Sequence, residues 1–258
     1  MTKYIFIYIL NIIIITYLKN KLYNYISMLQ QAVLLYALIS TRRTNPQTKY
    51  YFDPRIHNFG NVGFGGHVHS LLAPYATKMI DEKCYNSVNI RQLILSNYNQ
   101  EFYNNNERLP KLIDLCCGTG TSTCDNQVGV DTSSHMITQA KKINNKKNNK
   151  KTQFIEGNAE DYGQEDEFDA ATIMFAFHEM PNYAHHKIIK NAKRITTRDI
   201  IIVDINPTYK PSILMLSGEP YLLNYKATIQ SLLAQHNFSY LEYIPNHVGI
   251  WTFKHTES

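Results

Sequence analysis

A short turn that contains two glycines is the part of this sequence best suited to hold a ligand. An apolar run at residues 112–115 contains Asp114 and predicts a buried strand, which stops at Cys116-Cys117-Gly118-Thr119-Gly120. Glycines one residue apart let the backbone turn sharply and approach a ligand closely, because no Cβ is in the way. Since open parallel sheets bind ligands at the carboxyl ends of their strands, we expect a ligand crevice here.

A second candidate for ligand binding is the acid that ends the next apolar run. Val128-Gly129-Val130 predicts another buried strand, and Asp131 follows it directly. A carboxylate at the carboxyl end of such a strand can accept hydrogen bonds from both ribose hydroxyls of a nucleoside. We therefore expect Asp131 to face a ribose.

A histidine and a glutamate follow a later apolar run, at residues 168–174, and are the candidate catalytic residues. The chain leaves that run as Phe175-Ala176-Phe177-His178-Glu179-Met180-Pro181. Histidine titrates near neutral pH, so His178 can act as a general base at this edge of the sheet. The alternative is that His178 and Glu179 only line a pocket, orient a loop or pack under the next helix, and both interpretations stay open.

Together these residues resemble the class I S-adenosylmethionine-dependent methyltransferases. The first motif of that family, roughly Asp-Leu-Gly-Cys-Gly-Thr-Gly, stands here as residues 114–120, with Cys116 in place of a glycine. Further matches follow in the order and spacing of small-molecule enzymes related to the quinone-biosynthesis C-methyltransferases. They are Asp131, Phe154-Ile155-Glu156-Gly157-Asn158-Ala159-Glu160-Asp161, Phe168-Asp169-Ala170-Ala171-Thr172 and the segment 175–181. The resemblance covers residues 109–205 well and the rest poorly.

The resemblance implies S-adenosyl-L-methionine as the cofactor and a role for each matching residue. Asp114, Gly118 and Gly120 would approach its amino-acid end, Asp131 its ribose, and Asn158 and Ala159 its adenine. The complete set of expected cofactor-binding residues is Asp114, Cys116, Gly118, Thr119, Gly120, Asp131, Thr132, Met136, Asn158, Ala159, Glu160 and Phe175. Asn158 stands where the family has an aspartate, so its contact with adenine lacks a charge.

The fold class that these motifs imply is α/β. We expect a Rossmann-like, seven-stranded, mostly parallel sheet with helices on both faces and an N-terminal helical cap. Strands are expected near residues 112–115, 128–131, 152–156, 168–174 and 200–205, with an antiparallel pair at 238–244 and 248–254. Apolar stripes predict helices at 71–85, 90–98, 133–147, 182–194 and 221–235.

Two connections are less regular. The chain between Gly120 and Val128 is short for a parallel crossover, which needs ~10–12 residues. We expect a helix of one to two turns there, opened by Thr121 or Ser122. Residues 98–108 are polar and rich in asparagine, and they predict a loop.

The chain divides into three parts. Residues 1–45 are a hydrophobic, helical extension, residues 46–108 a helical cap with a substrate loop, and residues 109–258 the cofactor-binding domain. Aromatic residues and glycines at 50–69 predict a mobile loop that shapes the substrate pocket. His57, His67 and His69 in this loop are weighed as metal ligands, but Asp53 is the only carboxylate near them in the sequence, so we expect no metal.

The nearly continuous apolar stretch at residues 4–18 leaves two interpretations open. It is short for a spanning helix, which needs ~20 residues, and it lacks a small-x-small cleavage site. It is either a membrane signal-anchor or a packed or loosely attached helix. We therefore expect a cytoplasmic protein, with membrane association through residues 4–18 as the open alternative.

Composition limits the class of partner. With 258 residues, 44% of them hydrophobic and 18% charged, the chain can bury an α/β core and is not broadly disordered. The net charge of +5 owes much to lysines at 141–151, which have no aromatics between them, so we expect no nucleic acid partner. The four cysteines include no Cys-x-x-Cys pair and are expected to be small buried thiols.

The predicted activity is methyl transfer to a small or lipid-like acceptor that is largely apolar or aromatic. A nicotinamide-dependent oxidoreductase is disfavoured, because Thr123 stands where Gly-x-Gly-x-x-Gly requires its third glycine. A non-catalytic binding or scaffold protein with the same fold is the remaining alternative. It is suggested by the short connection after Gly120, by Cys116 and by Asn158.

Overall fold

The computed structural model describes residues 49–147 and 151–256. The expected N-terminal extension, residues 1–45, and its apolar stretch at 4–18 lie outside the described residues. Within the part that is described, no helix combines the length and the apolar character needed to cross a bilayer.

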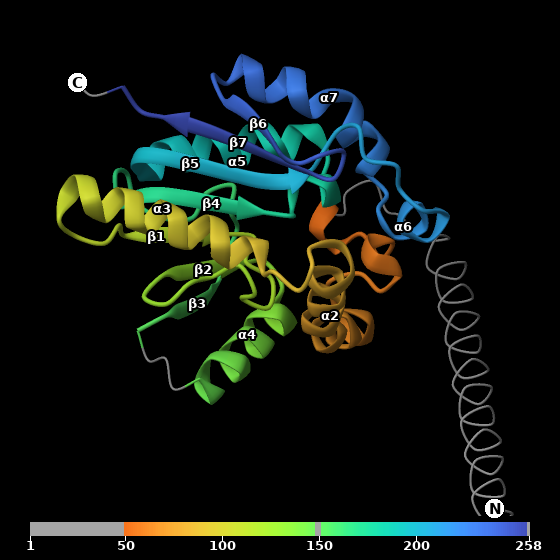
Figure 1. Ribbon diagram of the computed structural model, residues 1–258. Coiled ribbons are helices and arrows are strands. Elements are labelled where there is room, and N and C mark those ends of the chain that lie inside the picture. The colour runs from red at the N-terminus through yellow and green to blue at the C-terminus, as the bar shows by residue number, and fades with distance from the viewer. Residues whose placement is uncertain (1–48, 148–150, 257–258) are drawn as a thin grey trace, which may run out of the picture. The chain divides into compact units, whose positions relative to one another are not determined.

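A seven-stranded sheet in the order β3-β2-β1-β4-β5-β7-β6 forms the centre of the protein (Figure 1). The parallel strands are β1 (Leu112–Leu115), β2 (Val128–Asp131), β3 (Gln153–Glu156), β4 (Phe168–Met174) and β5 (Thr196–Ile205). The antiparallel strands are β6 (Ser239–Ile244) and β7 (Val248–Lys254). The predicted sheet, with its closing antiparallel pair, is confirmed.

Helices cover both faces of the sheet, as predicted. They are α2 (Gly63–Cys84), α3 (Ile90–Asn106), α4 (Ser134–Lys146), α5 (Asn182–Ile195), α6 (Ile213–Gly218) and α7 (Leu222–Gln235), with 3-10 turns η2 (Tyr50–Phe52), η3 (Ile56–Asn58) and η4 (Phe177–Glu179). Side chains alternate across β1, because successive residues of a strand point to opposite faces. Ile113 and Leu115 pack in one core with α5 and α7, while Leu112 packs in a second core with α3. Figure 1 shows α3 on the near face.

The predicted helix between Gly120 and Val128 is wrong, because residues 116–127 run through turns and bends. Ser122, one of the two expected caps, and the next residue, Thr123, are bound to the sheet instead. Ser122 Oγ and Thr123 Oγ1 donate to the carboxylate of Asp114 at 2.8 and 2.7 Å. These bonds draw the segment back onto β1, and a crossover of this length leaves little chain for a helix.

The segment at residues 63–69 was also predicted wrongly, since it forms the first turns of α2 and not a loop. Its glycines permit a close approach of backbones. A Cβ on Gly65 would lie 1.8 Å from the carbonyl oxygen of Phe59, and one on Gly66 would lie 2.5 Å from that of Asn61. Glycine is unfavourable in isolated helices, but the close approach of residues 59 and 61 to α2 requires Gly65 and Gly66 here.

Helix α3 continues past the predicted end near Tyr98 to Asn106. Its start is capped by the side chain of Asn89, which accepts the backbone N–H of Gln92 at 3.2 Å. Its last turns are held by Phe102, which is buried. The polar, asparagine-rich sequence marks the solvent-facing side of the helix, so composition alone gave the wrong prediction for residues 98–106.

Candidate active site

One cavity of about 750 Å³ lies at the carboxyl ends of the parallel strands. The arrowheads of β4 and β5 point toward the side of the molecule where α2 and α6 lie (Figure 1). One part of the lining comes from the turn after β1 and from the ends of β2 and β3, for example Gly118, Asp131 and Asn158. Another comes from α2 and α6, with Leu72 and Leu214 among them.

The turn after β1 is held in the left-handed region of φ. Gly118 and Gly120 have φ of 52° and 76°, and Cys116, which stands where the resembled family has glycine, has φ of 62°. A Cβ built on Gly118 meets no atom within 4 Å, so this residue borders open space, whereas one on Gly120 would lie 2.6 Å from the ring of Phe154. The two glycines therefore differ in use: Gly118 leaves room for a ligand and Gly120 allows packing.

Asp131 ties the turn after β1 to the start of α4. Its Oδ2 accepts the backbone N–H of Gly118 at 2.9 Å, and its Oδ1 accepts that of Ser133 at 2.8 Å. Burial raises the pKa of Asp131 to about 6, against the opposing effect of these two hydrogen bonds. The carboxylate lines the cavity and each oxygen has a further lone pair, so it can accept hydrogens from a bound diol.

Asp114 is buried in the sheet and does not line the cavity. Besides Ser122 and Thr123, it accepts a hydrogen bond from Thr172 Oγ1 on the neighbouring strand β4 at 3.1 Å. Burial raises its pKa to about 6, although all three hydroxyls favour the charged form. These hydrogen bonds anchor the turn after β1 to the sheet, and a contact of Asp114 with the cofactor stays a prediction.

Most of the residues expected around the cofactor come together at the cavity. Those that line it are Cys116, Gly118, Thr119, Asp131, Thr132, Met136, Asn158, Ala159 and Phe175, together with the two expected catalytic residues, His178 and Glu179. Those that do not line it are Asp114, Gly120 and Glu160. Glu160 instead pairs with Lys187 Nζ at 3.0 Å. The amide oxygen of Asn158, expected near adenine, already accepts the backbone N–H of Glu160 at 3.0 Å.

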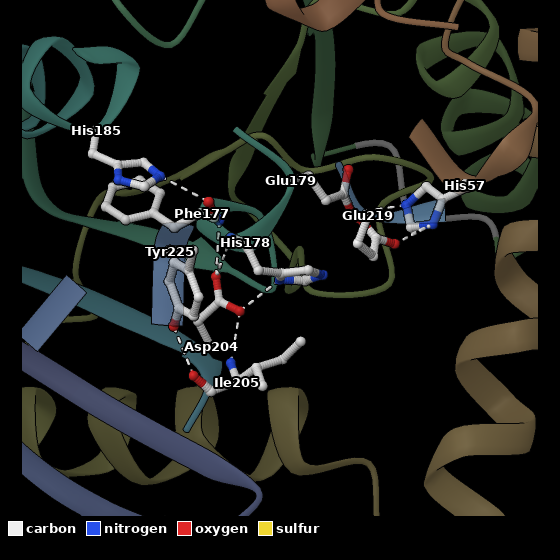
Figure 2. Close-up of polar contacts among 9 residues, drawn as sticks. All are labelled: His57, Phe177, His178, Glu179, His185, Asp204, Ile205, Glu219 and Tyr225. Atoms are coloured by element: carbon white, nitrogen blue, oxygen red, sulfur yellow. Dashed lines mark hydrogen bonds and ion pairs between the residues drawn. The ribbon is translucent and has the colours of Figure 1, made fainter. Parts of the chain in front are cut away.

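His178 is fixed by Asp204, which ends β5 (Figure 2). His178 Nδ1 lies 2.6 Å from Asp204 Oδ1, and the other oxygen of Asp204 accepts the backbone N–H of Phe177 at 2.8 Å. Burial alone would lower the pKa of His178, but the negative charge of Asp204 raises it to about 9. This direction favours the protonated ring, which can donate a hydrogen bond, and the role of His178 as a general base stays a prediction.

Two further residues support this turn from the side of α5 and α7. His185 Nε2 lies 2.7 Å from the carbonyl oxygen of Phe177, and the two rings stack with centroids 4.5 Å apart. Tyr225 donates its hydroxyl to the carbonyl of Ile205 at 2.7 Å. Both are buried, so the position of η4 is set by packing and by these two hydrogen bonds (Figure 2).

Glu179 points to a different partner, His57 of η3 (Figure 2). His57 Nε2 lies 2.9 Å from Glu179 Oε1, and His57 Nδ1 lies 2.8 Å from Glu219 Oε1. His67 and His69, the other two histidines considered as metal ligands, do not belong to the group formed by His57, Glu179 and Glu219. The ring of His69 lies 4.4 Å from that of His57, whereas His67 contacts the ring of His135.

The sequence analysis missed two buried charged residues of the cavity, Arg91 and Glu219. The guanidinium of Arg91 lies 4.2 Å from the ring centroid of Phe175, and its Nη1 lies 3.2 Å from Asp81 Oδ1. Neither residue belongs to a recognisable motif. In the sequence, the burial of Arg91 is indicated only by its place on the apolar stripe of a predicted helix, which is a weak signal. No feature of the sequence indicates the burial of Glu219.

The comparisons with known proteins agree with this geometry. Residues 112–199 match the family described as "Methyltransferase domain". Magnesium protoporphyrin IX methyltransferase from Synechocystis, solved with bound SAM, is 14% identical, with 83% of this chain and 100% of that chain covered and a TM-score of 0.56. WbdD, solved with a kinase inhibitor, is 16% identical, with 67% and 42% covered and a TM-score of 0.50. No curated protein matches the chain. At these identities the two structures are evidence of the fold.

Proposed function

We propose that this protein, whose residues 112–199 carry a methyltransferase domain of the class I, S-adenosylmethionine-dependent type, transfers a methyl group from that cofactor to a small or lipid-like acceptor. The observation that carries the proposal is the cavity at the carboxyl edge of the sheet. Its size, about 750 Å³, falls in the range of ~300–1,000 Å³ that is usual for small-molecule sites.

The cofactor would occupy the part of the cavity near β1, β2 and β3. Asp131 offers a charged acceptor to the ribose hydroxyls, and Gly118 leaves room for the cofactor to approach the backbone. Asn158 and Ala159 border the space proposed for the adenine. In this arrangement Asp114 acts at one remove, by holding the turn through Ser122 and Thr123.

The acceptor would occupy the part nearer α2 and α6. Its lining is mostly aliphatic or aromatic, and the apolar side chains from these two helices are Leu72, Ala73, Ala76, Ile80, Leu214 and Met215. Several of them are also partly open to solvent, including Leu72 at 46% and Leu214 at 68% exposure. Apolar walls that continue to an exposed rim favour an acceptor that is largely apolar or aromatic. Residues 46–108 would thus form the cap of the acceptor site.

The sulfonium methyl group of the cofactor is already activated, so the protein mainly aligns the acceptor and excludes water. His178, with its ring fixed by Asp204 and lining the cavity, can donate a hydrogen bond to an acceptor oxygen. Glu179 contributes a carboxylate beside it. Transfer then requires little covalent chemistry from the protein.

An isotope experiment tests this proposal. The full chain is incubated with cofactor labelled in its methyl group and with a cell extract, and Asp131→Ala serves as the matched control of weakened cofactor binding. We expect label in a low-mass, solvent-extractable fraction with the wild type and much less with the variant. Label that appears mainly in nucleic acid or protein contradicts the proposed acceptor class, and no labelling at all contradicts the activity.

A further inference from the structure

We infer that His57, Glu179 and Glu219 form a binding site for one divalent transition-metal ion, such as Zn²⁺ or Mn²⁺, in the wall of the cavity. The three residues come from separate parts of the chain: η3, η4 and the position after α6. No metal was expected from the sequence, because both glutamates are far from His57 along the chain.

The convergence of potential ligand atoms is the first observation. One atom from each residue lies within 4.8 Å of the other two. The two carboxylates approach the two nitrogens of His57 at 2.9 and 2.8 Å. Ligand atoms ~2.0–2.2 Å from one tetrahedral ion lie roughly 3.3–3.6 Å from one another, so the three atoms would draw together by about an ångström from their spread of 4.8 Å.

An unpartnered carboxylate oxygen is the second, independent observation. Glu219 Oε2 is buried and has no hydrogen-bond partner among the described residues, and the side chain of Glu219 is 6% exposed. A buried acceptor without a donor is costly, and an oxygen of a charged group more so. A bound cation beside Glu219 would satisfy this oxygen, and Figure 2 shows His57 joined to both glutamates.

The donor set fits the proposed class of ion. Imidazole nitrogen and carboxylate oxygen together suit Zn²⁺ or Mn²⁺ better than a soft ion. On binding, one nitrogen of His57 takes the metal and its proton leaves to solvent, while the other nitrogen keeps its proton. Each glutamate then turns one carboxylate oxygen to the ion. Without metal, a doubly protonated His57 can bridge both glutamates and keep the ligands together.

All three residues line the cavity, and His57 and Glu179 are 32% and 25% exposed, so an ion has a path to the site. Three protein ligands leave a coordination position open, as in catalytic sites. If the protein is a methyltransferase, as proposed above, the open position would face the acceptor and bind its oxygen, lowering the pKa of a hydroxyl that is to be methylated.

The direct test measures metal binding without any activity. The full chain without a histidine tag is stripped with a chelator and titrated separately with Zn²⁺ and Mn²⁺ by calorimetry. We expect one ion per chain with at least one of the two metals. Glu219→Gln and His57→Gln should weaken binding by more than the ~10–100-fold that loss of an outer-shell partner costs.

A matched control comes from the exposed pair His186 and His236, whose ring nitrogens lie 2.8 Å apart. This pair could bind a metal adventitiously, so the variant His186→Gln/His236→Gln should bind as the wild type does. Equal binding by wild type and Glu219→Gln, loss only in the His186 and His236 variant, or no binding at all would each overturn the inference.

Two measurements keep the test decisive. Thermal melts show whether each variant folds, and if Glu219→Gln does not, Glu179→Gln at the more exposed ligand replaces it. Titration with S-adenosylhomocysteine separates the two proposals. Cofactor binding without metal binding overturns only the metal site, and metal binding without cofactor binding overturns only the proposed function.

Discussion

The carboxylate of Asp114 accepts a hydrogen bond from Thr123 Oγ1 at 2.7 Å, which joins the middle of the sheet to the segment where a helix was expected. Ser122 and Thr172 donate to the same carboxylate. A buried charge is thus held by three neutral hydroxyls. This arrangement preserves the shape of the turn but leaves the charged form of Asp114 disfavoured by burial.

The stability of Asp114→Asn relative to the wild type should therefore rise with pH. Because the pKa of Asp114 is raised to about 6 in the folded state, its stabilising contribution is full below the unfolded pKa of ~3.9 and is lost as pH rises through 6. The variant does not titrate there. Between pH 4 and 7, the free energy of unfolding of the variant should rise relative to that of the wild type by at most ~3 kcal/mol, since one pKa unit is ~1.4 kcal/mol.

Melting temperatures of both proteins across this pH range provide the measurement. Asp131 also has a pKa of about 6, but it is present in both proteins and its effect cancels in the difference. A difference in melting temperature that does not change with pH would show that the charge of Asp114 does not destabilise the folded protein.

Gly65→Ala should disrupt the packing of η3 against α2. The added Cβ would lie 1.8 Å from the carbonyl oxygen of Phe59, and backbone cannot move away as a flexible side chain can. We expect the free energy of unfolding to fall by at least ~1–3 kcal/mol, as in overpacked cores. At ~2–4 °C per kcal/mol, Tm should then fall by several degrees. The exposed residue Lys78 on the same helix gives the control, Lys78→Ala, which should stay within ~0.5 kcal/mol. Equal melting of both variants would contradict the close approach.

The sequence allowed good prediction of those parts of the fold that follow from local pattern. Strands such as β1 and β4 have continuous apolar runs because both faces are covered, and the glycines after β1 mark a turn in any context. The errors lie where tertiary contacts decide. Ser122 is a good helix cap in isolation but binds Asp114 here, and Gly65 breaks isolated helices but is required by the close approach of Phe59.

The candidate site divides in the same way. Gly118 and Asp131 belong to separate motifs, but each lies at the end of a parallel strand, so the sequence could predict that both reach the same edge of the sheet. The contacts of Glu219 with His57 could not be predicted, because they depend on how the loop around α6 folds over η3. No local property of Glu219 indicates its burial, and a single sequence contains no information on that loop.

Arg91→Met should destabilise the protein by leaving Asp81 buried and unpaired. The two side chains are 8% and 11% exposed, and their closest atoms lie 3.2 Å apart. Breaking such a buried pair costs ~3–5 kcal/mol, whereas replacing both partners by apolar residues is often neutral. The double variant Arg91→Met/Asp81→Leu should therefore melt closer to wild type than Arg91→Met does. Additive losses in the double variant would contradict this account.

Asp131→Ala should weaken binding of S-adenosylhomocysteine by roughly 10–100-fold, because hydrogen bonds to a charged group contribute ~1.5–3 kcal/mol. The structure adds a second effect. Asp131 also accepts the backbone N–H groups of Gly118 and Ser133, so the alanine variant loses these bonds and should be less stable by ~1–3 kcal/mol. Asp131→Asn keeps one acceptor oxygen without the charge, and its affinity should fall between the other two.

Calorimetric titration of wild type, Asp131→Ala and Asp131→Asn, beside thermal melts without ligand, separates the loss of binding from the loss of stability. Equal affinity in the three proteins would remove Asp131 from the cofactor site. Lower stability of the variants with unchanged affinity would mean that Asp131 only anchors the turn after β1.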